Sequence, residues 1–209
     1  MSELRATRDM PSGMDRIGQG LSIRMPARYT TVSIQIECGS PLVRHPVTVR
    51  GVELPHSPNT TTGRDPIFWW RGPNHWLATS EGLRASELVS ELTVATAGGL
   101  CAVVDTSDAM TAFQLLGSAV PALLARGTSL DLDRGVFAPG RCARTRLTGL
   151  AVLLRPLEGD GYEVLVDRSE AQFLLDWFRD CAAGLHLSHE AVLPIETVAG
   201  TVTANVAEQ

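Results

Sequence analysis

The stretch from Gly99 to Cys181 constrains the fold of this chain most strongly, because it consists of short apolar runs separated by turn residues. Most runs have the length of a β-strand, and two stretches read as helices. The strand-like runs lie at 100–104, 110–116, 142–147, 151–157 and 162–166, and the helical ones at 119–126 and 169–181. Strands interleaved with helices predict an α+β or α/β fold in which helices cover mixed sheets.

The pattern continues toward the N-terminus. Apolar and polar side chains alternate between residues 30 and 38, which is typical of a half-buried strand. A weaker strand is predicted at 47–54, and apolar residues at helical spacing predict a helix at 81–97. We therefore expect an extended N-terminal arm at 1–28, one domain at 29–185 and a C-terminal tail at 186–209.

The net charge and the basic residues bear on which classes of partner this chain can bind. The net charge is −5, and every basic residue is arginine because lysine is absent. Nucleic-acid binding requires clustered basic residues, so we expect no nucleic-acid partner. The first twenty residues lack the apolar core of a secretory signal, and no run reaches the length of a membrane helix. The expectation is a cytoplasmic protein without membrane contact.

The sequence suggests no catalytic, cofactor-binding or metal-binding residues. The glycines at 18 and 20 lack the strand, the helix and the third glycine of a dinucleotide-binding turn. Without lysine there is no phosphate-binding loop of the Gly-Lys-Ser/Thr type. The cysteines, Cys38, Cys101, Cys142 and Cys181, are too widely spaced for a zinc knuckle, and we interpret His186 and His189 as surface residues.

An aromatic cluster between residues 69 and 76 is the candidate subunit interface. Two interpretations stay open: an exposed hot spot for a partner, or a hairpin whose indole rings pack in the core. The period of a strand sends Trp69 and Trp70 to opposite faces, so one should enter the core and the other should point away. The candidate contact residues are Trp69, Trp70, Arg71 and Trp76.

Four sequence blocks carry a resemblance to a known family. They lie at 71–77 (Arg-Gly-Pro-Asn-His-Trp-Leu), 127–133, 137–145 and 162–169, and Trp177 follows them. Together they resemble the gamma subunit of heterotetrameric sarcosine oxidase, which is itself similar to the folate-binding domain of the aminomethyltransferase (glycine cleavage T-protein) family. The resemblance implies that 29–185 is an aminomethyltransferase-like domain. Residues 148–154 lack the carboxylates that the aminomethyltransferases carry there, which implies a retained fold and a lost catalytic site.

The resemblance also implies partners and cofactors. It implies a complex with alpha, beta and delta subunits that oxidises sarcosine to glycine and in which this chain supports assembly without catalysing. FAD, FMN, NAD, tetrahydrofolate and zinc are then expected in the partner subunits and none in this chain. Two alternatives remain: a subunit of a related dehydrogenase of N-methyl amino acids such as N-methylglutamate, or a free-standing folate-binding, aminomethyltransferase-like domain.

Overall fold

The computed structural model describes residues 13–40, 42 and 46–190. Its strands are β1 (Gly13–Gly18), β2 (Leu21–Met25), β3 (Thr30–Ile36), β4 (Thr48–Val49), β5 (Val52–Glu53), β6 (Thr61–Gly63), β7 (Ile67–Gly72), β8 (His75–Ser80), β9 (Cys101–Asp105), β10 (Met110–Leu116), β11 (Ala143–Leu147), β12 (Leu150–Pro156) and β13 (Gly161–Asp167). Its helices are α1 (Ala85–Ala95), α2 (Val120–Leu124) and α3 (Ala171–Glu190), with a 3-10 turn at Arg168–Glu170.

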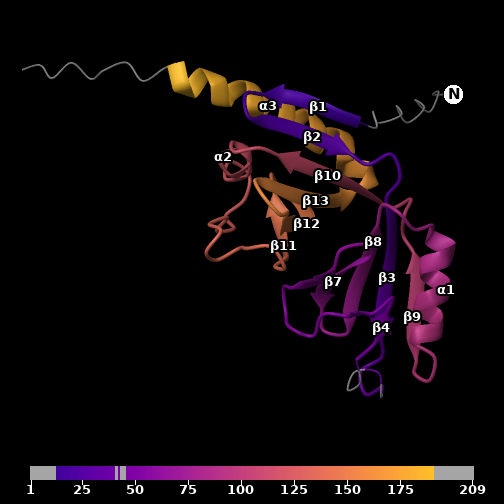
Figure 1. Ribbon diagram of the computed structural model, residues 1–209. Helices are drawn as coiled ribbons and strands as arrows, with labels where there is room; N and C mark the ends of the chain where they lie inside the picture. The colour runs from indigo at the N-terminus through magenta and orange to yellow at the C-terminus, as the bar shows by residue number, and fades with distance from the viewer. Residues whose placement is uncertain (1–12, 41, 43–45, 191–209) are drawn as a thin grey trace, which may run out of the picture.

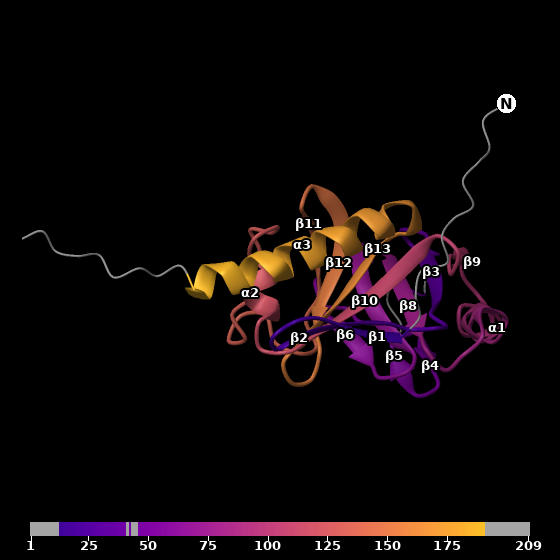
Figure 2. The same cartoon turned by 90° about the horizontal axis from the view of Figure 1, so that it is seen from above.

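Two sheets with a helix on the outer side of each make up the fold (Figure 1). One sheet has the order β1-β2-β10-β13-β12-β11, the other has the order β6-β7-β8-β3-β9, and β4-β5 forms a separate ribbon. Figure 2 shows α3 crossing over the first sheet, while α1 lies beside the second. The predicted helix-covered sheets are confirmed. Because the strands pair antiparallel, the class is α+β, with antiparallel rather than mixed sheets.

The outer face of the six-stranded sheet is covered by the apolar face of α3. The Phe178 ring packs edge-on against Phe113 of β10, with ring centroids 5.6 Å apart. The buried face of this helix comprises Ala171, Leu174, Leu175, Phe178 and Ala182. Its burial in one cluster with β2, β10, β12 and β13 holds this helix on the sheet.

A second apolar cluster joins the two sheets. Trp69 and Leu77 of the five-stranded sheet contribute to it from one side, and Leu153 and Leu165 of the six-stranded sheet contribute from the other. The outer face of the five-stranded sheet packs instead against α1 through Leu88 and Leu92. Each sheet is therefore apolar on both faces over part of its area.

The prediction of an extended arm at 1–28 is wrong for the residues that the structure describes. Residues 13–25 form the hairpin β1-β2, and β2 pairs with β10. The reason is the period-two alternation of Leu21, Ile23 and Met25, whose side chains are buried under α3. Residues 1–12 lie outside the described part of the chain.

The predicted start of the tail at residue 186 is also wrong, because α3 continues to Glu190. Gly184 lies within the helix and does not end it. A glycine in a helix interior costs only about 1 kcal/mol, which the packing of the preceding turns outweighs. The remaining predicted tail residues, 191–209, lie outside the described part, and among the described residues no helix has the length and apolar character needed to cross a bilayer.

Arg134 links the connection between α2 and β11 to the turn between β12 and β13 through hydrogen bonds. Its guanidinium donates to the carbonyls of Leu157 (3.1 Å), Gly159 (2.8 Å) and Gly161 (2.9 Å). It also lies over the Tyr162 ring, 4.6 Å from the centroid. No local sequence pattern predicts this role, since Arg134 follows Asp131 and Asp133 in a charged stretch.

Substitution of Arg134 by lysine should lower the free energy of unfolding by about 2 kcal/mol, because one ammonium group cannot reproduce three bonds in a planar fork. Urea denaturation of the variant and the parent chain measures the difference. The control is Arg141→Lys, at an exposed arginine of the same connection. Equal stability of both variants would show that the Arg134 bonds contribute nothing.

Candidate subunit-contact site

The β7-β8 hairpin positions the four candidate contact residues. Its turn is built from Gly72, Pro73 and Asn74, and Asn74 adopts the left-handed conformation (φ 56°) that asparagine tolerates well. Trp69 points between the two sheets and is fully buried, and its indole N–H donates to Thr79 Oγ1 at 2.9 Å. The prediction that one of the two neighbouring tryptophans enters the core is therefore confirmed for Trp69.

The other two tryptophans lie on the outer face of the same sheet, opposite each other in the strand register. Trp76 is buried and donates its indole N–H to the Pro55 carbonyl at 2.8 Å. Trp70 is half-buried beside a cavity of about 320 Å³. The cavity is also lined by Ile36, Leu42, Val47, Leu54, His56, Pro58, Pro73 and Asn74.

The burial of these side chains reduces the number of candidate contact residues. Trp69 and Trp76 are covered by the chain itself, so neither ring offers a surface to a partner. Trp70 and Arg71 keep part of their surface exposed, on opposite faces of the sheet. Only these two of the four residues remain candidates for contact with another subunit.

Arg71 is aimed by a β-bulge. Trp70 pairs with Trp76 but Gly72 pairs with His75, so Arg71 is the extra residue of β7. Bulges of this kind re-aim a side chain. The Arg71 side chain lies in a groove between the sheets, and its Nε is buried without a hydrogen-bond partner in the described structure.

Positive charge gathers around Arg71. Burial and the neighbouring Arg144 guanidinium both lower the pKa of Arg71. The pKa of His75 is lowered by burial and by the same two arginines, and its Nε2 lies 3.0 Å from Ser33 Oγ. The imidazole is therefore held neutral at physiological pH.

A partly buried polar network occupies another part of the space between the sheets. Glu163 is only 1% exposed and accepts from Arg155 Nε at 2.6 Å and from Gln114 Nε2 at 3.0 Å. Gln114 also donates to Glu81 at 2.8 Å, and Arg24 donates to both Gln114 and Glu81. Although burial raises the pKa of Glu81, the bonds from Arg24 and Gln114 outweigh it, and the net pKa is lowered. The two carboxylates are thus fully engaged.

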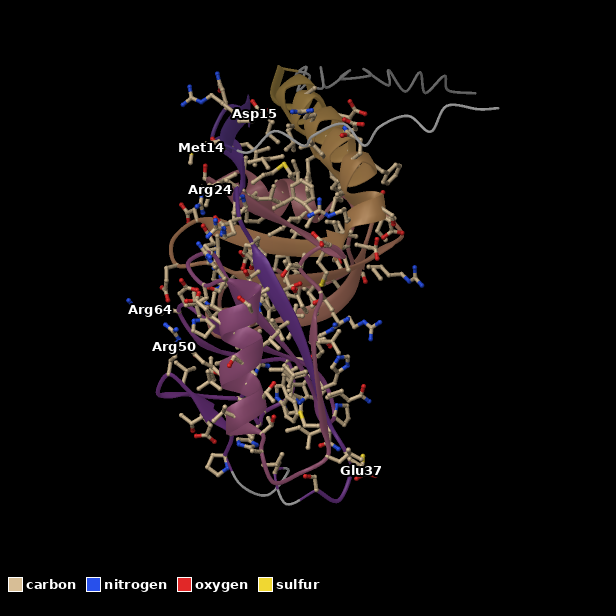
Figure 3. The ribbon with its side chains drawn as sticks, turned by 90° about the vertical axis from the view of Figure 1, so that its right-hand side faces the viewer. Met14, Asp15, Arg24, Glu37, Arg50 and Arg64 are labelled. Carbon is tan, nitrogen blue, oxygen red and sulfur yellow. The ribbon has the colours of Figure 1, made fainter. Side chains whose placement is uncertain are left out.

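Figure 3 shows Arg24 on β2 near the level where the two sheets meet, with Arg64 further along the same side. A cavity of about 200 Å³ adjoins the network there and is lined by Arg64, Tyr29 and Glu163. Tyr29 Oη is buried and makes no hydrogen bond to a described residue, and burial, followed by the Glu163 charge, raises its pKa. Sequence reasoning missed this network. Its one signal was a glutamate inside the apolar run of β13.

The other predicted positions carry little chemistry. Cys142 is buried, and burial raises the pKa of its thiol to about 11, so the thiol stays protonated. The β11-β12 turn contains Thr148 and Gly149, both with positive φ. Within the described residues, no three His, Cys, Asp or Glu side chains group as metal ligands. His186 and His189 lie in α3, outside the residues whose side chains are described.

Comparison with known proteins gives two kinds of likeness. A family model described as the sarcosine oxidase, gamma subunit family matches residues 43–184. In structure, the chain is similar to one of heterotetrameric sarcosine oxidase from Corynebacterium sp. U-96 in complex with pyrrole 2-carboxylate, with a TM-score of 0.70 and 24% identity, covering 78% of this chain and 84% of that one. It is more distantly similar to the glycine cleavage system aminomethyltransferase T from Bartonella henselae, with a TM-score of 0.52 and 13% identity over 76% of this chain and 45% of that one. No curated protein matches the sequence.

Proposed function

This chain belongs to the sarcosine oxidase gamma subunit family, and on that premise we propose that it is the non-catalytic gamma subunit of a sarcosine oxidase-type flavoenzyme. In this proposal the complex oxidatively demethylates sarcosine to glycine in the cytoplasm. This chain supports the assembly of alpha, beta and delta subunits, which hold FAD, FMN, NAD, tetrahydrofolate and zinc. The observation that carries the proposal is the family match over well over half of the chain.

The polar network supports a structural role for the carboxylates of this chain. A general base must be free to take a proton from a substrate. Glu163 instead accepts from Arg155 and Gln114, and Glu81 accepts from Arg24 and Gln114. Both carboxylates serve the junction of the two sheets, and the turn that bears the acidic residues in aminomethyltransferases has none here.

The structural similarity to aminomethyltransferase T supports a shared fold but does not support a shared reaction. The chain spans less than half of that protein's length. A subunit of a related N-methyl amino acid dehydrogenase, for example one acting on N-methylglutamate, is the nearest alternative, because such a complex would use the same kind of gamma subunit. A free-standing folate-binding domain is the second and less favoured alternative.

Co-expression tests the proposal directly. A tagged copy of this chain should co-purify with flavin-containing larger subunits at a fixed ratio, and the complex should oxidise sarcosine faster than N-methylglutamate. Mass analysis of the eluted complex and peroxide formation with each amine are the measurements. A chain that elutes alone, or that binds tetrahydrofolate by itself, would contradict the assembly role, whereas faster oxidation of N-methylglutamate would support the related dehydrogenase.

A further inference from the structure

A groove between the two sheets holds positive charge that the described chain does not neutralise. The groove has a volume of about 270 Å³ and is lined from both sheets. Arg71 enters it from β7, and Arg144 enters it from β11, the edge strand of the six-stranded sheet. Its apolar wall includes Leu153 and Leu165. The groove thus combines two cationic groups with an apolar lining.

Neither arginine has a counter-charge in the described part of the chain. Among the described residues, no carboxylate lies within ion-pair distance of Arg71 or Arg144. The one carboxylate that lines the groove, Asp167, accepts instead from the backbone N–H and the hydroxyl of Ser169, at 2.9 and 2.6 Å. Asp167 is also two strands away from Arg144 in the sheet, about 10 Å at the usual strand spacing. Arg144 is exposed, but Arg71 is half-buried, and a half-buried guanidinium without a partner is costly. An anion in the groove would remove this cost.

The groove also adjoins an uncovered part of the five-stranded sheet. Trp69, Leu77, Ser33 and Val104 stand opposite one another across β7, β8, β3 and β9. Trp69 and Leu77 are fully buried under the six-stranded sheet, but Val104 at the other end of this row is 53% exposed. The six-stranded sheet therefore covers only part of the facing sheet, and an apolar side chain remains bare beside the charged groove.

We propose that this groove is a docking site for an acidic segment of a partner subunit, whose Asp or Glu carboxylate is bound by Arg71 and Arg144 while the rest of the segment covers Val104. The inference rests on the proposed assembly function. An arginine fork matches a carboxylate in geometry and charge, and the overall charge of −5 makes a local cationic groove a specific feature of this chain. A free small anion would neutralise the arginines, whereas a protein segment would also cover Val104.

The experiment compares co-expressed complexes that contain Arg71→Gln, Arg144→Gln or Arg16→Gln. Arg16 is the matched control, because it is an exposed arginine on β1, the opposite edge strand of the same sheet. We expect Arg71→Gln to raise the Kd of this chain for its partner subunits by about thirtyfold or more. Arg144→Gln should act in the same direction, and Arg16→Gln should change nothing. The Kd of the parent complex should rise with added salt, and that of the Arg71→Gln complex should rise less.

Other measurements separate docking from a structural role. Because Arg71 makes no ion pair, the midpoint of thermal unfolding of the full chain should not fall in the Arg71→Gln variant. Arg71→Lys, which keeps the charge without the fork, should give an intermediate Kd. A large drop in the unfolding midpoint, or equal Kd values for Arg71→Gln and Arg16→Gln, would overturn the proposal.

A small-anion site is tested with sodium succinate as the probe. If succinate raises the unfolding midpoint of the parent chain but not that of Arg71→Gln, the groove binds a free carboxylate. The proposal of a docked partner segment would then be wrong. Failure of the assembly function is distinguishable, because then the parent chain itself would not co-purify. If the parent and Arg71→Gln chains co-purify with the same Kd, only the docking site fails.

Discussion

Substitution of Trp69 by alanine should lower the free energy of unfolding by about 3–5 kcal/mol, as for other truncations of buried tryptophan. The ring is fully buried between the sheets, and the Arg155 guanidinium lies 5.3 Å from its centroid. Its indole N–H also bonds Thr79 Oγ1, which would be left without its donor. Urea denaturation, followed by circular dichroism, measures the loss.

Trp70→Ala is the matched control, one residue further along the same strand. Trp70 is half-buried, so its removal should cost clearly less stability than that of Trp69. In the proposed complex it should instead weaken assembly by about 2 kcal/mol, roughly thirtyfold in affinity. Equal losses of stability in the two variants, with no change in assembly, would assign both rings to the core alone.

Substitution of Arg155 by methionine should destabilise the fold by about 3–5 kcal/mol, because it leaves an unpaired buried charge. The charge is that of Glu163, whose shortest bond is the one from Arg155 Nε at 2.6 Å. Gln114 would remain as a neutral donor and cannot balance a carboxylate. The free energy of unfolding at neutral pH is the quantity to compare.

Two further variants test this explanation. Adding Glu163→Gln to Arg155→Met removes the orphan charge, so the double variant should regain part of the lost stability. Arg50→Met breaks an exposed pair with Glu91 and should leave the unfolding midpoint almost unchanged. If Arg155→Met behaves like Arg50→Met, the network contributes no more than a surface ion pair.

Sequence periodicity was sufficient for the elements that bury one face. The strand at 30–38 and the last helix, predicted from residue 169 onward, were both found in this way. The hairpin β1-β2 was missed because β1 is mostly exposed, so its side chains show no alternation. The alternation in β2 covers only five residues, and it indicates a strand only once the pairing with β10 is known.

The candidate site, too, could be predicted only in part from the sequence. The strand period predicts that Trp69 and Trp70 face opposite ways, but which of them is buried depends on a second sheet that the local sequence does not reveal. The Arg24 bonds join residues 57 and 90 positions apart, so no local pattern predicts them. The bulge that aims Arg71 likewise arises from the pairing of two strands.

The order of strands has a consequence for synthesis on the ribosome. The five-stranded sheet is drawn from residues 61–105 and the neighbouring strand β3, and so it can form while the rest of the chain is still being made. The strand β2 emerges before it and must wait for β10, whose paired residues come 90 to 94 positions later. Contacts between residues so far apart in the sequence slow folding. Until β10 arrives, the apolar side of β2 has no cover within its own chain. The first hairpin of a nascent chain is therefore open to premature association.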